Sequence, residues 1–71
     1  MSFEQLDFAT FCIGALSTRL SMTQGEVYNR LKNSGILSDY LVPAYDVLHT
    51  FSRDYIVDDL VSLMRERGVL A

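Results

Sequence analysis

The residues with the clearest chemical potential lie in segment 45–50, which reads YDVLHT and closely follows the only proline. His49 is the only histidine of the chain, and on a helix Tyr45 and Asp46 would lie about one turn before it. An aspartate beside a histidine can orient the imidazole for acid–base chemistry, and both residue types bind metal ions. One alternative for this chain is therefore a small enzyme or metal-binding protein centred on His49 and Asp46.

The sequence lacks the further residues that acid–base catalysis or metal binding would require. Two ligands are too few for a defined metal site, and no Cys/His set has zinc spacing. Cys12 is the only thiol, but it lies in an apolar helical stretch, where cysteine normally acts as a small hydrophobe. We therefore predict no catalytic, metal or cofactor site. We interpret His49 as a residue near a helix C-terminus that interacts with free carbonyls and with Asp46.

Acidic residues form a second group of candidates near the C-terminus, namely Asp54, Asp58, Asp59 and Glu66. Asp54 and Asp58 are one helical turn apart, so together they could bind a hard cation or meet a basic partner. The chain has no EF-hand loop with alternating oxygen ligands around a glycine turn. The favoured interpretation of the acidic set is a solvated helix face.

Composition limits the class of protein. The chain has 71 residues, 49% of them hydrophobic, which predicts one domain spanning residues 1–71 with its own core. The net charge is −3 and the six Lys and Arg residues are dispersed, which disfavours a nucleic acid as the main ligand. There is no apolar stretch of membrane-spanning length and no signal-peptide pattern, so we expect no membrane association and a cytoplasmic location.

Helical patterns account for the whole chain, and the first helix is the most apolar. A capping-box pattern at Ser2 predicts a helix to about Leu20. Two apolar stripes follow its length: Leu6, Ala9, Ile13, Leu16 and Leu20 on one face, and Phe8, Phe11, Cys12 and Ala15 beside it. Either neighbouring helices bury both stripes, or the Phe-rich stripe stays open and another chain covers it.

Three further helices are predicted after the first. Thr23 begins the second, which buries Val27, Tyr28 and Leu31 and ends at Gly35, with Ile36 and Leu37 folding back. Ser38 is the candidate cap of a third helix, which should be short or kinked near Pro43. Ser52 caps a last helix from about Arg53 to Arg67, ended by Gly68. The expected fold is an all-α, compact small bundle of about four helices.

Residues 22–41 also fit a helix-turn-helix pattern superficially. Its second helix would begin DYLVP, without Arg, Lys, Asn or Gln to contact base edges, so a helical hairpin explains the pattern better. Aromatic residues occur near the predicted helix junctions: Tyr28, Tyr40, Tyr45, Phe51 and Tyr55. We assign them to core edges by default, because an interface would need several of them exposed together.

Segments 45–50 (YDVLHT) and 54–59 (DYIVDD) resemble a small bacterial family known as domain of unknown function 3791. The aromatic first helix with Phe11 and Cys12, residues 23–31 and the GIL at 35–37 are also similar, so the resemblance covers nearly the whole chain. It implies no catalytic residues. It implies short bacterial proteins encoded beside ADP-ribosyltransferase-like proteins in toxin–antitoxin-type arrangements, and hence a partner that binds and neutralises a toxin.

From the residues and this resemblance we predict a non-enzymatic protein–protein interaction module, antitoxin-like in role. The predicted contact residues are Phe8, Phe11, Ala15, Tyr45, Asp54 and Asp58. The apolar stripe would supply the buried centre of the interface, and the acids would steer a basic partner. A self-associating structural domain, forming a homodimer, is the alternative.

Overall fold

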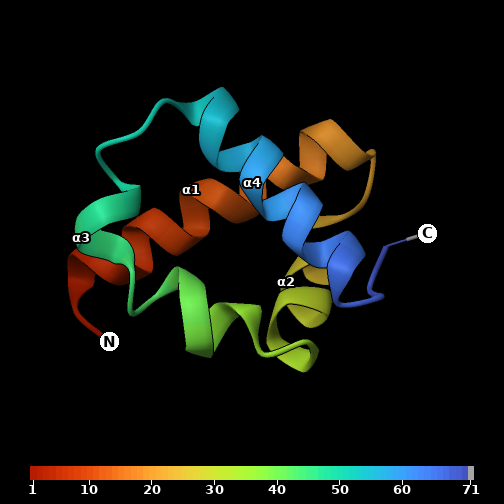
Figure 1. Cartoon of the computed structure of the whole chain (residues 1–71), viewed down its shortest axis with the longest axis horizontal. Coiled ribbons are helices and arrows are strands. Elements are labelled where there is room, and N and C mark those ends of the chain that lie inside the picture. The colour runs from red at the N-terminus through yellow and green to blue at the C-terminus, as the bar shows by residue number, and fades with distance from the viewer. Residues whose placement is uncertain (71) are drawn as a thin grey trace.

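The computed structural model describes residues 1–70, which fold into four α-helices and one short π-helix (Figure 1). The elements are α1 (Phe3–Leu20), α2 (Gln24–Asn33), η1 (Leu37–Leu41), α3 (Tyr45–Leu48) and α4 (Arg53–Glu66). α4 crosses over α1, α2 packs near the C-terminal end of α1, and α3 lies at the N-terminal end. Since no strand occurs in residues 1–70, the all-α prediction is confirmed.

Side-chain caps fix where the three longer helices begin. The Ser2 hydroxyl accepts a hydrogen bond from the Gln5 N–H, and the Gln5 side chain accepts from the Ser2 N–H, which completes the predicted capping box. Thr23 and Ser52 cap α2 and α4 in the same position, as the sequence predicted. These caps satisfy backbone N–H groups that a helix otherwise leaves unpaired at its first turn.

The segment around Pro43 is where the local prediction was partly wrong. Ser38 does not cap a helix; it lies inside η1, whose π-type turn is closed by the Val42 N–H bonding the Leu37 carbonyl at 3.1 Å. Pro43 follows directly and has no N–H to donate, so one helical bond is missing there, while the Ala44 N–H bonds the Tyr40 carbonyl at 2.9 Å across it. The chain resumes as α3, four residues long, which confirms a short third helix near Pro43.

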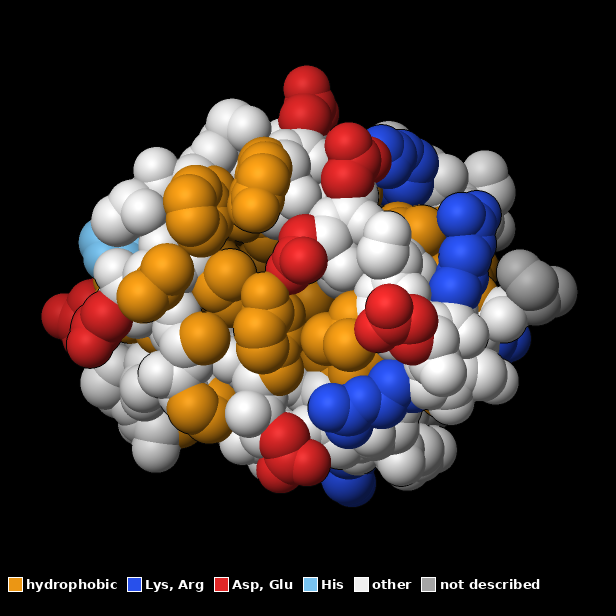
Figure 2. Space-filling model, in the orientation of Figure 1, with side chains coloured by type: hydrophobic (Ala, Val, Ile, Leu, Met, Phe, Trp, Pro, Cys, Tyr) orange, Lys and Arg blue, Asp and Glu red, His pale blue; other side chains and the backbone are white. Residues whose placement is uncertain are grey.

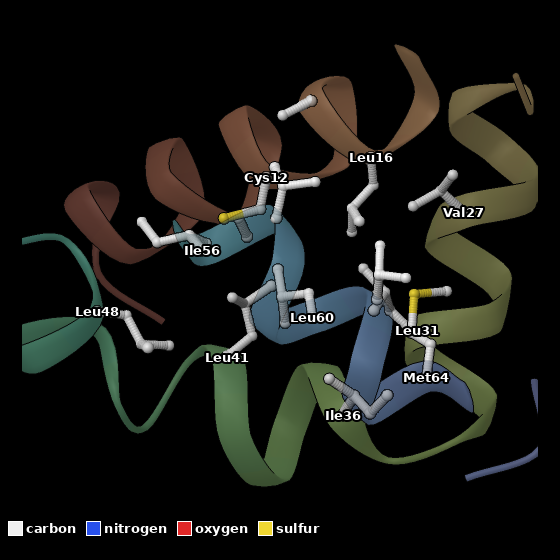
Figure 3. Close-up of a cluster of buried hydrophobic side chains, with 14 of the residues drawn as sticks. Cys12, Leu16, Val27, Leu31, Ile36, Leu41, Leu48, Ile56, Leu60 and Met64 are labelled. Atoms are coloured by element: carbon white, nitrogen blue, oxygen red, sulfur yellow. The ribbon is translucent and has the colours of Figure 1, made fainter. Parts of the chain in front are cut away.

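The core lies between α1, α2, η1 and α4 (Figure 3). Its fully buried larger side chains are Cys12, Leu16, Val27, Leu31, Ile36, Leu41, Leu60 and Met64. The buried face of α1 combines members of both predicted stripes, because Phe8, Ala9, Cys12, Ala15 and Leu16 are buried while Leu6 and Phe11 are exposed. The fold therefore uses the middle of the apolar surface of α1 and leaves its two edges open.

Two predictions about the second helix have different outcomes. Gly35 has a positive φ of 83° and Ile36 is fully buried, so the predicted left-handed end with its apolar contact is confirmed. Tyr28, predicted to be buried, is 42% exposed. Val27 and Leu31 are one turn apart and already face the core, whereas Tyr28 is rotated by about 100° from Val27 towards solvent.

The last helix begins at Arg53 as predicted and ends at Glu66, one residue before the predicted end. Gly68 follows with a φ of 74°, a backbone conformation that glycine adopts without strain. In residues 1–70, no helix combines the length and the apolar character that crossing a membrane requires.

Candidate functional site

The ring of His49 stacks on that of Tyr45, with centroids 4.5 Å apart and planes inclined by 17°. Tyr45 also meets Phe8 edge to face, with centroids 5.5 Å apart. The His49 N–H donates to the Tyr45 carbonyl at 3.0 Å and so closes α3. These three rings join α3 to the N-terminal half of α1. The described hydrogen bonds include none between His49 and Asp46, so the predicted interaction with Asp46 is replaced by stacking on Tyr45.

The thiol that a catalytic interpretation would need is placed elsewhere. Cys12 is fully buried in the core, and desolvation raises the pKa of its thiol to about 12. The reactive form of cysteine is the thiolate, so this side chain is a poor nucleophile at neutral pH. Within residues 1–70, no three His, Cys, Asp or Glu side chains come together as a metal-binding group would. The contact that the structure shows for His49 is its stacking on Tyr45.

A groove of about 370 Å³ lies between the N-terminal half of α1, the end of α3 and the start of α4. Its lining residues are Glu4, Asp7, Phe8, Phe11, Tyr45, His49, Phe51, Arg53 and Ile56. Five of these nine carry aromatic rings, and the acids come from α1 while the arginine comes from α4. An apolar concave surface with a few charged groups at its edge is the usual composition of a binding site.

Two further hollows continue this groove along the contact between α1 and α4. One is lined by Asp7, Thr10, Phe11, Gly14, Ala15 and Arg53, and the next by Ala15, Thr18, Arg19, Arg53, Asp54 and Val57. Because they share Phe11, Ala15 and Arg53 with their neighbours, the three form one elongated surface. We call this surface the α1–α4 groove.

The predicted contact residues are distributed unevenly over this groove. Phe11 is 47% exposed and available to a partner, whereas Phe8 and Ala15 are buried, at 8% and 5% exposed. Phe8 and Ala15 therefore line the floor and offer little contact area. Tyr45 is half-buried at the wall, and Asp54 is exposed beside Arg53 in the last hollow.

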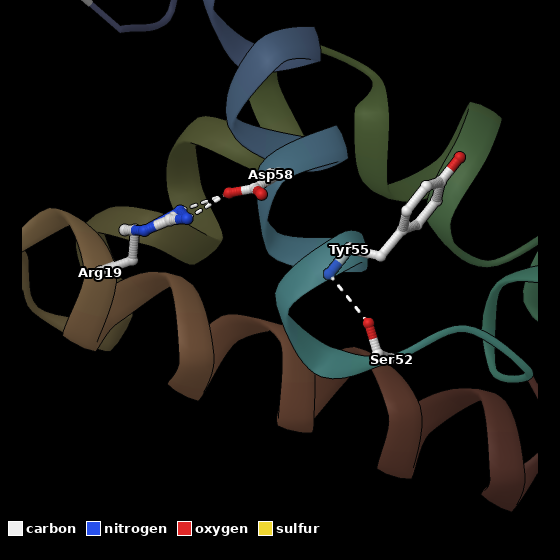
Figure 4. A network of polar contacts seen from close by, with 4 residues as sticks. All are labelled: Arg19, Ser52, Tyr55 and Asp58. Atoms are coloured by element: carbon white, nitrogen blue, oxygen red, sulfur yellow. Dashed lines mark hydrogen bonds and ion pairs between the residues drawn. The ribbon is translucent and has the colours of Figure 1, made fainter.

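Asp58 is the predicted contact residue that lies beyond these three hollows, in a further hollow that adjoins the last of them at Arg19. Its carboxylate pairs with the Arg19 guanidinium across α4 and α1, and both side chains are largely exposed. Figure 4 shows this pair on one side of α4 and Tyr55 on the other, with the Ser52 cap below them. The pair already occupies Asp58 within the chain, so Asp58 is less suited to a partner than Asp54.

Two aromatic residues that the sequence assigned to core edges lie on the surface. Phe51 and Tyr55 are both exposed, and their rings pack at 4.7 Å. Figure 2 shows hydrophobic side chains gathered on the face where α3, η1 and α4 meet, with acidic side chains among them. Glu4 and Asp7 were missed as groove residues. The sequence did contain a signal for their position in the groove, because four of its residues share one helical face: Glu4, Asp7, Phe8 and Phe11.

The fold and surface define a small all-α domain with an aromatic groove. A family model described as "Protein of unknown function (DUF3791)" matches residues 7–67, from within α1 to just beyond α4. The chain belongs to this family, which confirms the family resemblance seen in the sequence. No curated protein and no solved structure matched the chain.

Proposed function

We propose that this protein is a non-enzymatic protein–protein interaction module that binds its partner through the α1–α4 groove and the aromatic side chains beside it. The observation that carries the proposal is a pair of exposed aromatic side chains in the groove: Phe11 of α1 and Phe51, just before α4, are 47% and 41% exposed and line the same hollow. Other exposed large hydrophobic residues belong to the same two segments, 1–11 and 47–55, but do not line the groove: Met1, Phe3, Leu6, Val47 and Tyr55.

Exposed aromatic side chains that share one groove are more typical of a binding surface than scattered exposed residues are. Single exposed hydrophobic residues are common on any soluble protein, but large apolar side chains gathered around a groove mark sites of association. Aromatic residues are enriched at the centres of interfaces, where they supply a large apolar area with few rotatable bonds. Cys12 is buried in the core and His49 stacks on Tyr45, which supports a packing role for both side chains.

The partner that fits the family resemblance is an ADP-ribosyltransferase-like toxin encoded by a neighbouring gene, which the chain would bind and neutralise. A net charge of −3 supports such a partner, because an acidic surface complements a basic nucleotide-handling cleft and speeds association. The same charge works against a nucleic acid as the ligand.

The test co-expresses the chain with the transferase-like product of the adjacent gene and measures growth, complex formation and ADP-ribosylation. We expect the wild-type chain to restore growth and to co-purify with the transferase. Phe11→Asp should abolish both, since it places a charge at the centre of the apolar surface. Tyr28→Asp is the matched control, because Tyr28 is 42% exposed against 47% for Phe11 but lies on α2, away from the groove.

Three outcomes would count against the proposal in different ways. If Phe11→Asp captures the transferase as well as Tyr28→Asp does, the groove is not the contact surface. If the wild-type chain binds no neighbouring transferase, the antitoxin role is wrong. If the purified chain forms a concentration-dependent dimer that Phe11→Asp abolishes, the surface joins two copies of this chain, and the homodimer alternative replaces the proposal.

A further inference from the structure

We propose that the first part of the α1–α4 groove, lined by Glu4, Asp7, Phe11, His49 and Phe51, holds an arginine side chain presented by the partner protein. This inference rests on the proposed function and deepens it, because it specifies the chemistry that the partner must display.

Several aromatic rings line the groove. The end of α3 carries the stacked pair Tyr45 and His49, which rests on Phe8. Phe51, between α3 and α4, is 41% exposed and is held by its contact with Tyr55 at 4.7 Å. A planar guanidinium stacks on such ring faces more favourably than the compact, strongly hydrated ammonium of lysine. The walls therefore suit a flat cation.

The carboxylates at the rim supply the opposite charge. Glu4 and Asp7 are three residues apart on α1, both are exposed, and both line the groove. Throughout residues 1–70, the ion pair of Arg19 with Asp58 is the only one present, so no cation of this chain pairs with Glu4 or Asp7. Two carboxylates beside aromatic rings can accept several N–H groups from one guanidinium.

Whether a basic or an acidic occupant is favoured depends on the net charge of the lining residues. Arg53 is the one Lys or Arg among the residues lining this part of the groove, against the two acids Glu4 and Asp7. The local balance is therefore negative, as is the whole chain at −3, and both favour a basic over an acidic occupant. Arg53 also opposes the bound cation, so removing its charge should strengthen binding of an arginine.

The experiment uses NMR chemical-shift titration of the full-length chain with two peptides of blocked ends, Gly-Leu-Arg-Leu-Gly and its citrulline analogue. Citrulline keeps the shape of arginine but has no charge. We expect the arginine peptide to perturb the lining residues, and the citrulline peptide to bind about two- to fivefold more weakly. Asp7→Asn and Glu4→Gln should each weaken the arginine peptide by a similar factor, and Arg53→Gln should tighten it.

Glu66→Gln is the control for the acidic variants. It changes the net charge by the same amount, but Glu66 lies at the end of α4 and outside the described pockets. Circular dichroism establishes that each variant is folded; if Asp7→Asn is not, Glu4→Gln carries the test alone. Equal binding of the two peptides would overturn the inference. So would equal losses for Asp7→Asn and Glu66→Gln, or perturbations that fall outside the groove.

The outcome of the peptide titration can be distinguished from the outcome of the partner-binding test of the proposed function. If Phe11→Asp abolishes partner binding while the arginine and citrulline peptides bind alike, the groove is an interaction surface without a cation site. If the chain dimerises and the dimer competes with the arginine peptide, the occupant is a second copy of the chain, and the assignment to a separate partner is wrong.

Discussion

Tyr45 and His49 form a stacked pair one helical turn apart, with ring centroids separated by 4.5 Å. The contact closes α3, a helix of four residues that has no side-chain cap. Phe8 of α1 meets Tyr45 edge to face, so the stack also docks the short helix on the bundle. The only histidine of the chain is therefore explained by packing, and that explanation can be tested.

Replacing His49 by alanine should lower the free energy of unfolding by about 0.5–1.5 kcal/mol, the usual contribution of an aromatic pair. Urea denaturation followed by circular dichroism measures the change. His49→Phe is the control, because it keeps the ring against Tyr45 and should restore most of the stability. A His49→Ala chain as stable as the wild type would show that the stack contributes nothing to docking α3.

Gly25 within α2 and Gly35 just after it should change the stability of the fold in opposite directions when replaced by alanine. Gly35 has a φ of 83°, and an added Cβ would lie 2.9 Å from Asp39 Oδ2. Gly35→Ala should therefore cost about 1–2 kcal/mol of unfolding free energy. Gly25 has open space around its Cβ position within the helix, so Gly25→Ala should stabilise the fold by about 0.4–1 kcal/mol. Thermal melting of both variants checks the signs; a stabilising Gly35→Ala would contradict the assigned backbone conformation.

The sequence predicted the helices better than the surface they create, and particular residues show why. Caps are local signals, so Ser2, Thr23 and Ser52 were placed correctly from spacing alone. Ser38 was misplaced because the chain forms a π-helix over residues 37–41, in which Ser38 is an internal residue and caps nothing. Local periodicity does not reveal a single π-type turn.

For the candidate site, too, the local sequence pattern was predictable and the contacts between distant elements were not. An apolar surplus on α1 was visible in the sequence, but which residues stay open depends on how α4 crosses α1. That crossing buries Phe8 and Ala15 and leaves Phe11 exposed. Likewise, Glu4 and Asp7 became groove residues only because segment 49–53 packs against their side of α1. Contacts between elements distant in sequence cannot be derived from one sequence without its tertiary structure.

Cys12 should resist thiol reagents in the folded protein. Its side chain is fully buried and desolvation raises its pKa to about 12, so labelling must wait for the core to open. We expect reaction with a disulfide reagent at neutral pH to be about a hundredfold or more slower than in denaturant. The control is a chain carrying Cys12→Ala with Ser62→Cys, since Ser62 is exposed on α4. Rapid labelling of native Cys12 would place the thiol near the surface and reopen the catalytic interpretation.

The ion pair between Arg19 and Asp58 should contribute little to stability. The two side chains are 44% and 66% exposed, so solvent screens their attraction. A double-mutant cycle with Arg19→Gln and Asp58→Asn should give a coupling energy below about 1 kcal/mol. The coupling should nearly disappear at about 1 M salt, where the screening length falls to about 3 Å. A larger coupling that persists in salt would indicate that the pair anchors α4 on α1.

Tyr40 joins η1 to α4, because its hydroxyl donates a hydrogen bond of 2.5 Å to Asp59 Oδ2. Ionising Tyr40 would destroy this bond and place a phenolate against a carboxylate, and the phenol is also partly desolvated; these causes raise its pKa from 10.0 to about 12. The folded state thus binds the Tyr40 proton more tightly than the unfolded state does. The resulting stabilisation is complete below pH 10 and is lost as the pH rises through the folded-state pKa of about 12.

Tyr40→Phe should accordingly lower the unfolding free energy by about 1 kcal/mol at neutral pH, where the partly exposed bond is intact. The difference between wild type and Tyr40→Phe should shrink as the pH is raised from 10 to 12, because the wild type then loses the same bond. Urea unfolding across this range measures the difference, which cancels the titration of groups common to both chains. Tyr28→Phe is the control, since the exposed Tyr28 hydroxyl makes no described hydrogen bond and its removal should give a small difference. A Tyr40→Phe effect that stays constant through this range would show that the hydroxyl acts by packing, and that Asp59 does not hold its proton.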